Sequence, residues 1–161
     1  DDKYCAGDPN PDFYYGLNVK LSYKNWDFGF NGHGSLGYKV FNDFASNNST
    51  AYFDVNAGNL PNFATAVKRT GFTQISGDYQ FFSDFYLENA SFFRMDDINL
   101  GYTFKEIGNW GGNIRVAASC QNVFVITNYS GIDPEINSTD GVDRTFWPRP
   151  RTFSVRLNVN F

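Results

Sequence analysis

The clearest hydrophobic pattern in the sequence lies between Thr152 and Phe161. Polar side chains alternate there with apolar ones, at Phe153, Val155, Leu157, Val159 and Phe161. A period of two places all the apolar side chains on one face of a β-strand. The run has about the length that crosses a bilayer when a strand is tilted, and Arg156 lies on its polar face. An apolar face towards lipid and a polar face towards a wet interior would explain this segment.

Four earlier segments show the same alternation, so the sequence predicts five strands. They cover residues 13–23, 26–38, 93–104, 114–125 and 152–161. Lys24 and Asn25 separate the first two strands. This pair predicts a tight two-residue turn, because Asn tolerates the positive φ that such turns need.

The alternation changes phase within the third expected strand. The apolar residue Leu100 has an even residue number, whereas the apolar residues Phe93 and Met95 have odd numbers, so they would lie on the opposite face of a regular strand. One extra residue in a strand produces such a change, so the sequence predicts a β-bulge near Asp96 and Asp97.

The connections between the expected strands alternate in length. Short ones cover 24–25 and 105–113, and long ones cover 1–12, 39–92 and 126–151. Short turns at one end and long outer loops at the other are typical of outer-membrane barrels, which need an even number of at least about eight strands. The sequence therefore predicts an all-β fold, with about five antiparallel transmembrane strands from the C-terminal part of a larger outer-membrane β-barrel and long extracellular loops.

Composition and charge narrow the function classes. The 161 residues have a net charge of −4 and no basic cluster, which argues against a nucleic-acid partner. No run of about 18 apolar residues is present, so no transmembrane helix is expected. Eighteen Phe and ten Tyr also suit an alternative, a soluble β-sandwich that binds carbohydrate.

No group of residues points to catalysis or to a cofactor, so an enzyme is not expected. His33 is the only histidine and falls on the polar face of the second expected strand. Asp84 with Glu88, or Asp133 with Glu135, would suit a glycosidase pair. Seventeen acidic residues produce such pairs readily by chance.

The long connection before the last strand holds the candidate binding residues. Ca²⁺ prefers oxygen ligands, and a weak calcium candidate consists of Asp133, Glu135, Asp140 and Asp143. A solvated acidic loop is the alternative. Aromatic faces stack on sugar rings and Arg offers a planar set of donors. The candidates for contact with a substrate or a lid are Tyr129, Arg144, Phe146 and Trp147. Packing of the loop and a rim girdle are the alternatives for these four.

Several longer motifs follow one another along the chain. They are GDPNPDFYYG at 7–16, NASFFRMDDINLGY at 89–102, QNVF at 121–124, YSGIDPE at 129–135 and PRPRTF at 148–153. In this order they resemble the SusC/RagA-like TonB-dependent outer-membrane transporters of Bacteroidetes.

The resemblance implies a plugged barrel of roughly 22 strands in the outer membrane. It implies that a SusD-like lipoprotein caps the barrel and that the TonB complex drives import of glycans or peptides through the plug. The remaining barrel strands and outer-membrane lipid would be the other partners. The aromatic Phe161 would be the signal that the barrel-assembly machinery reads.

Overall fold

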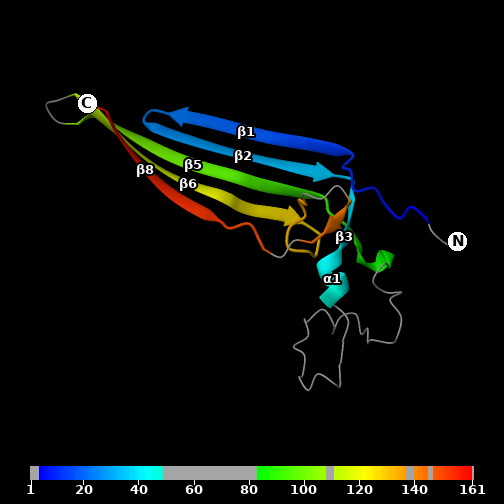
Figure 1. The fold of residues 1–161 in the computed structure, drawn as a ribbon. Helices are drawn as coiled ribbons and strands as arrows, with labels where there is room; N and C mark the ends of the chain where they lie inside the picture. The colour runs from blue at the N-terminus through cyan, green and yellow to red at the C-terminus, as the bar shows by residue number, and fades with distance from the viewer. Residues whose placement is uncertain (1–3, 49–82, 108–110, 137–139, 145–146, 161) are drawn as a thin grey trace, which may run out of the picture. The chain divides into compact units, whose positions relative to one another are not determined.

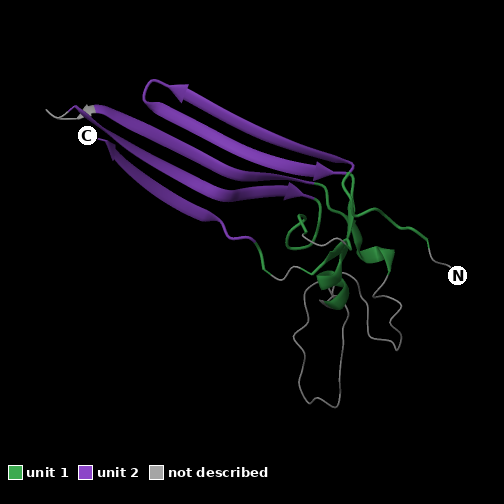
Figure 2. Cartoon of the chain, turned by 45° about the horizontal axis from the view of Figure 1, so that its top comes forward, with its two compact units in different colours: residues 1–11, 37–91, 128–148 green, residues 12–36, 92–127, 149–161 purple. Residues whose placement is uncertain are grey.

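The computed structural model describes residues 4–48, 83–107, 111–136, 140–144 and 147–160. These residues form two compact units, each made from separate stretches of the chain (Figure 2). Unit 1 comprises residues 1–11, 37–91 and 128–148, and unit 2 comprises 12–36, 92–127 and 149–161. None of the helices in the described part of the chain is long and apolar enough to span a membrane.

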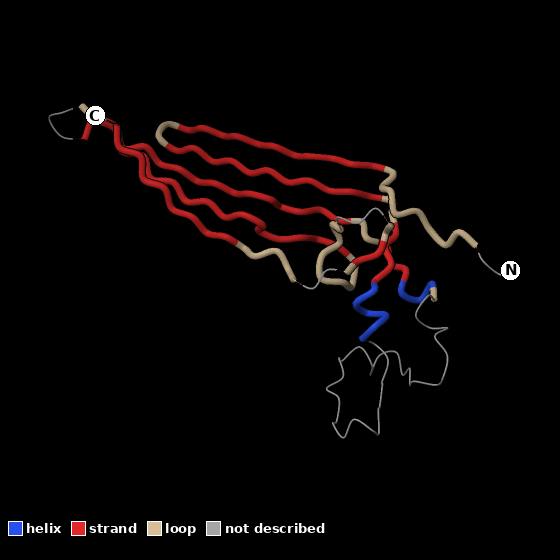
Figure 3. The backbone as a smooth tube through the Cα atoms, in the orientation of Figure 1, coloured by secondary structure: helices blue, strands red, loops and turns tan. Residues whose placement is uncertain are grey.

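Unit 2 is one antiparallel sheet of five strands in the order β1-β2-β5-β6-β8 (Figures 1 and 3). Its strands are β1 (Phe13–Tyr23), β2 (Trp26–Leu36), β5 (Phe92–Ile107), β6 (Gly112–Thr127) and β8 (Thr152–Asn160). The predicted fold class, all-β with five antiparallel strands, is confirmed. β5 and β6 extend further than the alternation indicated, so that only residues 108–111 separate them.

Register places the apolar residues of all five strands in rows on one face. Three of these rows are Tyr23-Trp26-Tyr102-Val116-Leu157, Leu21-Phe28-Leu100-Ala118-Val155 and Val19-Phe30-Ile98-Cys120-Phe153. This face is uncovered: Val155 is 80% exposed and Phe153 is 75% exposed. A β-sandwich would bury such a face against a second sheet, so the exposed rows argue against that alternative.

The predicted β-bulge lies in β5 and is confirmed. Asn31 pairs with Asp97 and Gly32 pairs with Met95, so Asp96 is the extra residue of β5. The insertion returns Met95 to the apolar face, because a shift of one residue exchanges the two faces of a strand.

The turn between β1 and β2 differs from the prediction. Lys24, the first turn residue, has the positive φ of 56°, and Asn25 does not.

Unit 1 contains a small sheet in the order β4-β3-β7, which the sequence analysis missed. Its elements are β3 (Lys39–Asn42), α1 (Asp43–Asn48), η2 (Asp84–Tyr86), β4 (Leu87–Asn89) and β7 (Val142–Asp143). β3 pairs antiparallel with β4 and parallel with β7. The second predicted strand was therefore too long at its end: β2 stops at Leu36, and Tyr38 lies in the core of unit 1.

The core of unit 1 is small and largely aromatic. Its buried apolar side chains are Tyr38, Val40, Tyr86, Ala90 and Tyr129. Tyr38 donates a hydrogen bond of 2.9 Å from its hydroxyl to the carbonyl of Pro134. The Asn42 side chain accepts a bond from the Ala45 amide and so caps the start of α1. The bond from Tyr38 joins the residue before β3 to a segment 96 residues further along the chain.

Candidate functional site

The second face of the unit 2 sheet is polar from β1 to β8. Register places three rows there: Ser22-Asp27-Gly101-Ala117-Arg156, Lys20-Gly29-Asn99-Ser119-Ser154 and Asn18-Asn31-Asp97-Gln121-Thr152. A sheet with one apolar face and one polar face of this extent fits a wall between lipid and water.

A shallow hollow of about 480 Å³ lies on this polar face over β5, β6 and β8. Its polar lining includes Asp97, Asn99, Arg115, Gln121, Ser154 and Arg156. Asp97 accepts a bond from the Asn99 amide at 3.1 Å. The lining therefore offers donors and acceptors to a hydroxyl-rich or peptide-like solute, and it holds no nucleophile paired with a base.

An ion pair crosses the polar face between strands that are not neighbours. Arg115 of β6 donates from Nε to Asp27 Oδ1 of β2 at 3.0 Å, and its Nη2 bonds the other carboxylate oxygen. β5 lies between these two strands, and Gly101 is its residue at the crossing. A Cβ at Gly101 would lie 2.5 Å from both Arg115 Nη2 and Asp27 Oδ1, so a larger residue there would force the two charged groups to move.

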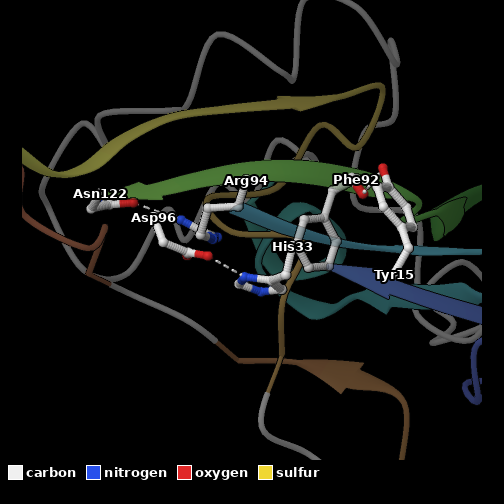
Figure 4. A network of polar contacts seen from close by, with 6 residues as sticks. All are labelled: Tyr15, His33, Phe92, Arg94, Asp96 and Asn122. Carbon is white, nitrogen blue, oxygen red and sulfur yellow. Dashed lines mark hydrogen bonds and ion pairs between the residues drawn. The ribbon is translucent and has the colours of Figure 1, made fainter. Parts of the chain in front are cut away.

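Polar side chains also gather around the β5 bulge (Figure 4). His33 Nδ1 lies 2.7 Å from Asp96 Oδ2, so the predicted polar role of the only histidine includes a specific partner. Arg94 is 3% exposed and donates to Asn122 Oδ1 at 2.8 Å. The Asn122 amide donates to the carbonyl of Arg149 at 2.7 Å and thereby holds the segment that leads into β8.

Tyr129 is corrected from a surface contact to a core residue of unit 1. Its side chain is 6% exposed, so its ring face is not available to a sugar or a lid. Its hydroxyl donates to Asp143 Oδ2 at 2.7 Å. Burial, and then the bond to Asp143, raise the pKa of Tyr129 well above its usual value, because a buried tyrosinate loses its hydration.

The structure does not bring the four calcium candidates together. Asp143 accepts from Tyr129, Asp133 accepts from the Glu135 amide at 2.9 Å, and Asp140 pairs with Arg144 at 2.9 Å. In the described part of the chain, no three His, Cys, Asp or Glu side chains are placed to hold a metal ion.

Asp84 and Glu88, the first candidate glycosidase pair, both accept hydrogen bonds from other parts of unit 1. Glu88 accepts from the Ser130 amide at 2.8 Å, from the Ser130 hydroxyl at 2.6 Å and from Asn42 at 3.1 Å. Asp84 accepts from the Tyr4 hydroxyl at 2.7 Å. These bonds tie the segments of unit 1 together, and sequence reasoning had no local signal for them because the partners are 42 or more residues apart.

The other candidates for contact differ in their surroundings. Trp147 is 84% exposed. Arg144 is also exposed and forms an ion pair with Asp140, four residues earlier. Phe146 and the assembly-signal candidate Phe161 lie outside the described residues. Trp147 and Arg144 are therefore the described candidates that remain accessible.

The sequence is similar over its whole length to part of known TonB-dependent receptors. It is 39% identical over 99% of the chain to TonB-dependent receptor SusC of Bacteroides thetaiotaomicron and 31% identical over 99% to TonB-dependent receptor P3 of Formosa agariphila. The chain spans only 16% and 17% of the length of these two relatives. No protein-family model matches the chain.

Solved structures show the same fold. Two structures of the RagAB peptide importer or transporter match 95% of the chain with TM-scores of 0.67 and 0.68, at 19% and 21% identity. The chain covers 18% and 17% of those chains. The resemblance to SusC/RagA-like TonB-dependent transporters, which the sequence motifs indicated, is confirmed.

Proposed function

We propose that this chain forms part of the wall of an outer-membrane β-barrel that imports glycans or peptides. The observation that carries the proposal is the uncovered apolar face that continues in register across all five strands. Lipid covers this face, and the polar face lines the interior of the barrel. Similarity to TonB-dependent receptors supports the same reading.

The chain contributes to import without chemical catalysis. Its polar face supplies hydrogen-bonding groups along the interior, and Asp27 and Arg115 neutralise each other there. The TonB complex supplies energy through the plug of the complete transporter, and further strands close the barrel to about 22.

Exposed side chains of unit 1 are suited to contact a SusD-like lipoprotein or the substrate. Its exposed Trp147 offers an aromatic face, and Arg144 offers planar donors beside Asp140. Phe146 is part of the same proposal. Hydrogen bonds from Ser130 and Asn42 to Glu88 hold separate segments of unit 1 together.

Two adjacent substitutions in β8 test the wall assignment. Val155→Arg places a charge on the apolar face, at a cost of roughly 2–4 kcal/mol near the middle of a bilayer. Ser154→Arg places the same charge on the polar face and serves as the matched control. We expect Val155→Arg to reduce the amount of folded, heat-modifiable protein in outer membranes and Ser154→Arg to leave it nearly unchanged. Equal behaviour of the two variants, in a protein that is soluble without detergent, would favour the carbohydrate-binding module.

The partner assignment has its own test. Detergent extraction of outer membranes is followed by affinity purification of the natural protein and identification of the lipoprotein that elutes with it. Trp147→Ala is expected to weaken this association or the uptake of oligosaccharides or peptides. The control is Phe85→Ala, because Phe85 is another exposed aromatic residue of unit 1. Unchanged association and uptake in Trp147→Ala would remove Trp147 from the proposed contact.

A further inference from the structure

A hollow of about 480 Å³ also lies on the apolar face of unit 2. It is lined by Trp26, Leu100, Gly101, Tyr102, Phe104, Val116 and Ala118. It arises because Ala118 is small within a row whose other members are Leu21, Phe28, Leu100 and Val155. Its size is within the roughly 300–1,000 Å³ of small-molecule sites, and its lining is almost wholly apolar.

Three aromatic rings form one wall of this hollow. The rings of Trp26 and Tyr102 meet edge to face with centroids 4.7 Å apart, and those of Tyr102 and Phe104 do the same at 4.7 Å. Edge-to-face pairs of this kind add to the stability of an arrangement beyond the burial of area. The wall is therefore held in place by its own contacts, and Trp26 still has half of its surface exposed.

A positive charge lies next to Tyr23, the residue of β1 that pairs with Trp26 of this wall. Lys24 Nζ is 5.3 Å from the centroid of the Tyr23 ring, and Tyr23 pairs in register with Trp26. The turn that carries Lys24 is attached to β5, because the Thr103 amide donates to the Asn25 carbonyl at 2.9 Å. Asp27, the closest acidic residue in sequence, lies on the polar face and pairs with Arg115.

We propose that this hollow, together with Lys24 of the adjoining β1–β2 turn, is a binding site for one anionic phospholipid. The aromatic wall and the floor at Ala118 take an acyl chain, and the Lys24 ammonium contacts the phosphate. Charge complementarity identifies the occupant, because an apolar slot with a cation on the adjoining turn matches a molecule with an apolar tail and a negative head. The inference rests on the proposed function, since the site must face lipid.

The test uses the complete natural protein, purified in a mild detergent and analysed by native mass spectrometry with added phosphatidylglycerol or phosphatidylcholine. We expect one retained phosphatidylglycerol per barrel, in preference to phosphatidylcholine. Lys24→Gln is expected to reduce its retention about fivefold, because one Lys near an anionic headgroup contributes that much. Lys20→Gln removes an exposed Lys from the polar face and should change nothing.

A second variant tests the slot independently of charge. Ala118→Leu fills the hollow and is expected to abolish retention of both lipids, whereas Val155→Leu on the neighbouring strand is the control. Heat-modifiability confirms that each variant is folded. Two results for a folded, detergent-dependent protein would overturn the site while leaving the proposed function intact. One is equal retention of phosphatidylglycerol and phosphatidylcholine. The other is that Lys24→Gln retains as much phosphatidylglycerol as the unchanged protein. Retention of lipopolysaccharide in place of phosphatidylglycerol would also overturn it. A protein soluble without detergent would instead overturn the proposed function.

Discussion

Asp27 and Arg115 pair across β5, directly over Gly101. Their strands flank β5 on its two sides, so this pair joins β2 to β6 through side chains, in addition to the backbone ladders that join each of them to β5. The glycine of the NLGY motif at 99–102 therefore has a steric reason: a Cβ would occupy the space in which the two charged groups meet.

Gly101→Ala is expected to disturb this pair and to lower the free energy of unfolding by about 0.2–1 kcal/mol, the range of exposed ion pairs. Gly16→Ala is the matched control on the same face, because the closest atom to its added Cβ is 4.0 Å away. The midpoint of urea unfolding of the refolded natural protein measures both. Equal midpoints would show that the pair does not depend on Gly101.

Deletion of Asp96 is expected to prevent folding of the sheet. Without this extra residue, Phe93 and Met95 move to the polar face, since one residue of shift exchanges the faces of a strand. Asp96→Ala keeps the length of β5 and loses only the contact with His33. Heat-modifiable migration on gels should be absent in the deletion and present in Asp96→Ala. A folded deletion variant would contradict the role given to the bulge.

Asn122→Ala is expected to cost about 2–4 kcal/mol in free energy of unfolding. It loses the charged hydrogen bond with Arg94 and the bond to the Arg149 carbonyl. It also places alanine at a φ of 51°, which costs about 1 kcal/mol. Asn122→Gly loses the same bonds without the backbone strain and should be the milder change. If both variants unfold together, the positive φ contributes nothing.

Tyr129→Phe is expected to lower the stability of unit 1 by about 1–3 kcal/mol, because buried Asp143 loses the hydrogen bond from the Tyr129 hydroxyl. Amide hydrogen exchange in residues 128–136 measures this change. Tyr4→Phe is the control: its bond to Asp84 has the same length of 2.7 Å, but the side chain is exposed. Equal protection in Tyr129→Phe and the unchanged protein would contradict a structural role for this bond.

The pKa of Tyr129 also predicts a pH dependence. Because the pKa is raised in the folded state, its contribution to stability is complete below the unfolded value of 10.0 and decreases as pH rises above it. The difference in tyrosinate absorbance between the unchanged protein and Tyr129→Phe should therefore show no ionisation near pH 10 while unit 1 is folded. A normal ionisation step there would show that Tyr129 is accessible to water.

The amino-acid sequence by itself determined the existence of the five strands of unit 2, the faces of their alternating side chains and the bulge at Asp96, although not the ends of β2, β5 and β6. These features are local: period-two alternation sorts side chains by face, and a change of phase marks an inserted residue. The residues Phe93 and Met95 were sufficient to locate the bulge without any knowledge of the neighbouring strands.

Only the tertiary structure decided which distant residues meet. Tyr129 looks like a surface aromatic in sequence, but it is buried in unit 1 and bonds to Asp143 of β7. The strands of that unit are two to four residues long, too short to show a period. The partner of Arg115 depends likewise on the order of the strands in the sheet. The partners of Asn122 depend on the left-handed backbone conformation of that residue. Alternation along one strand reports which face a residue occupies, whereas contacts between strands depend on register and on packing, which the local pattern does not contain.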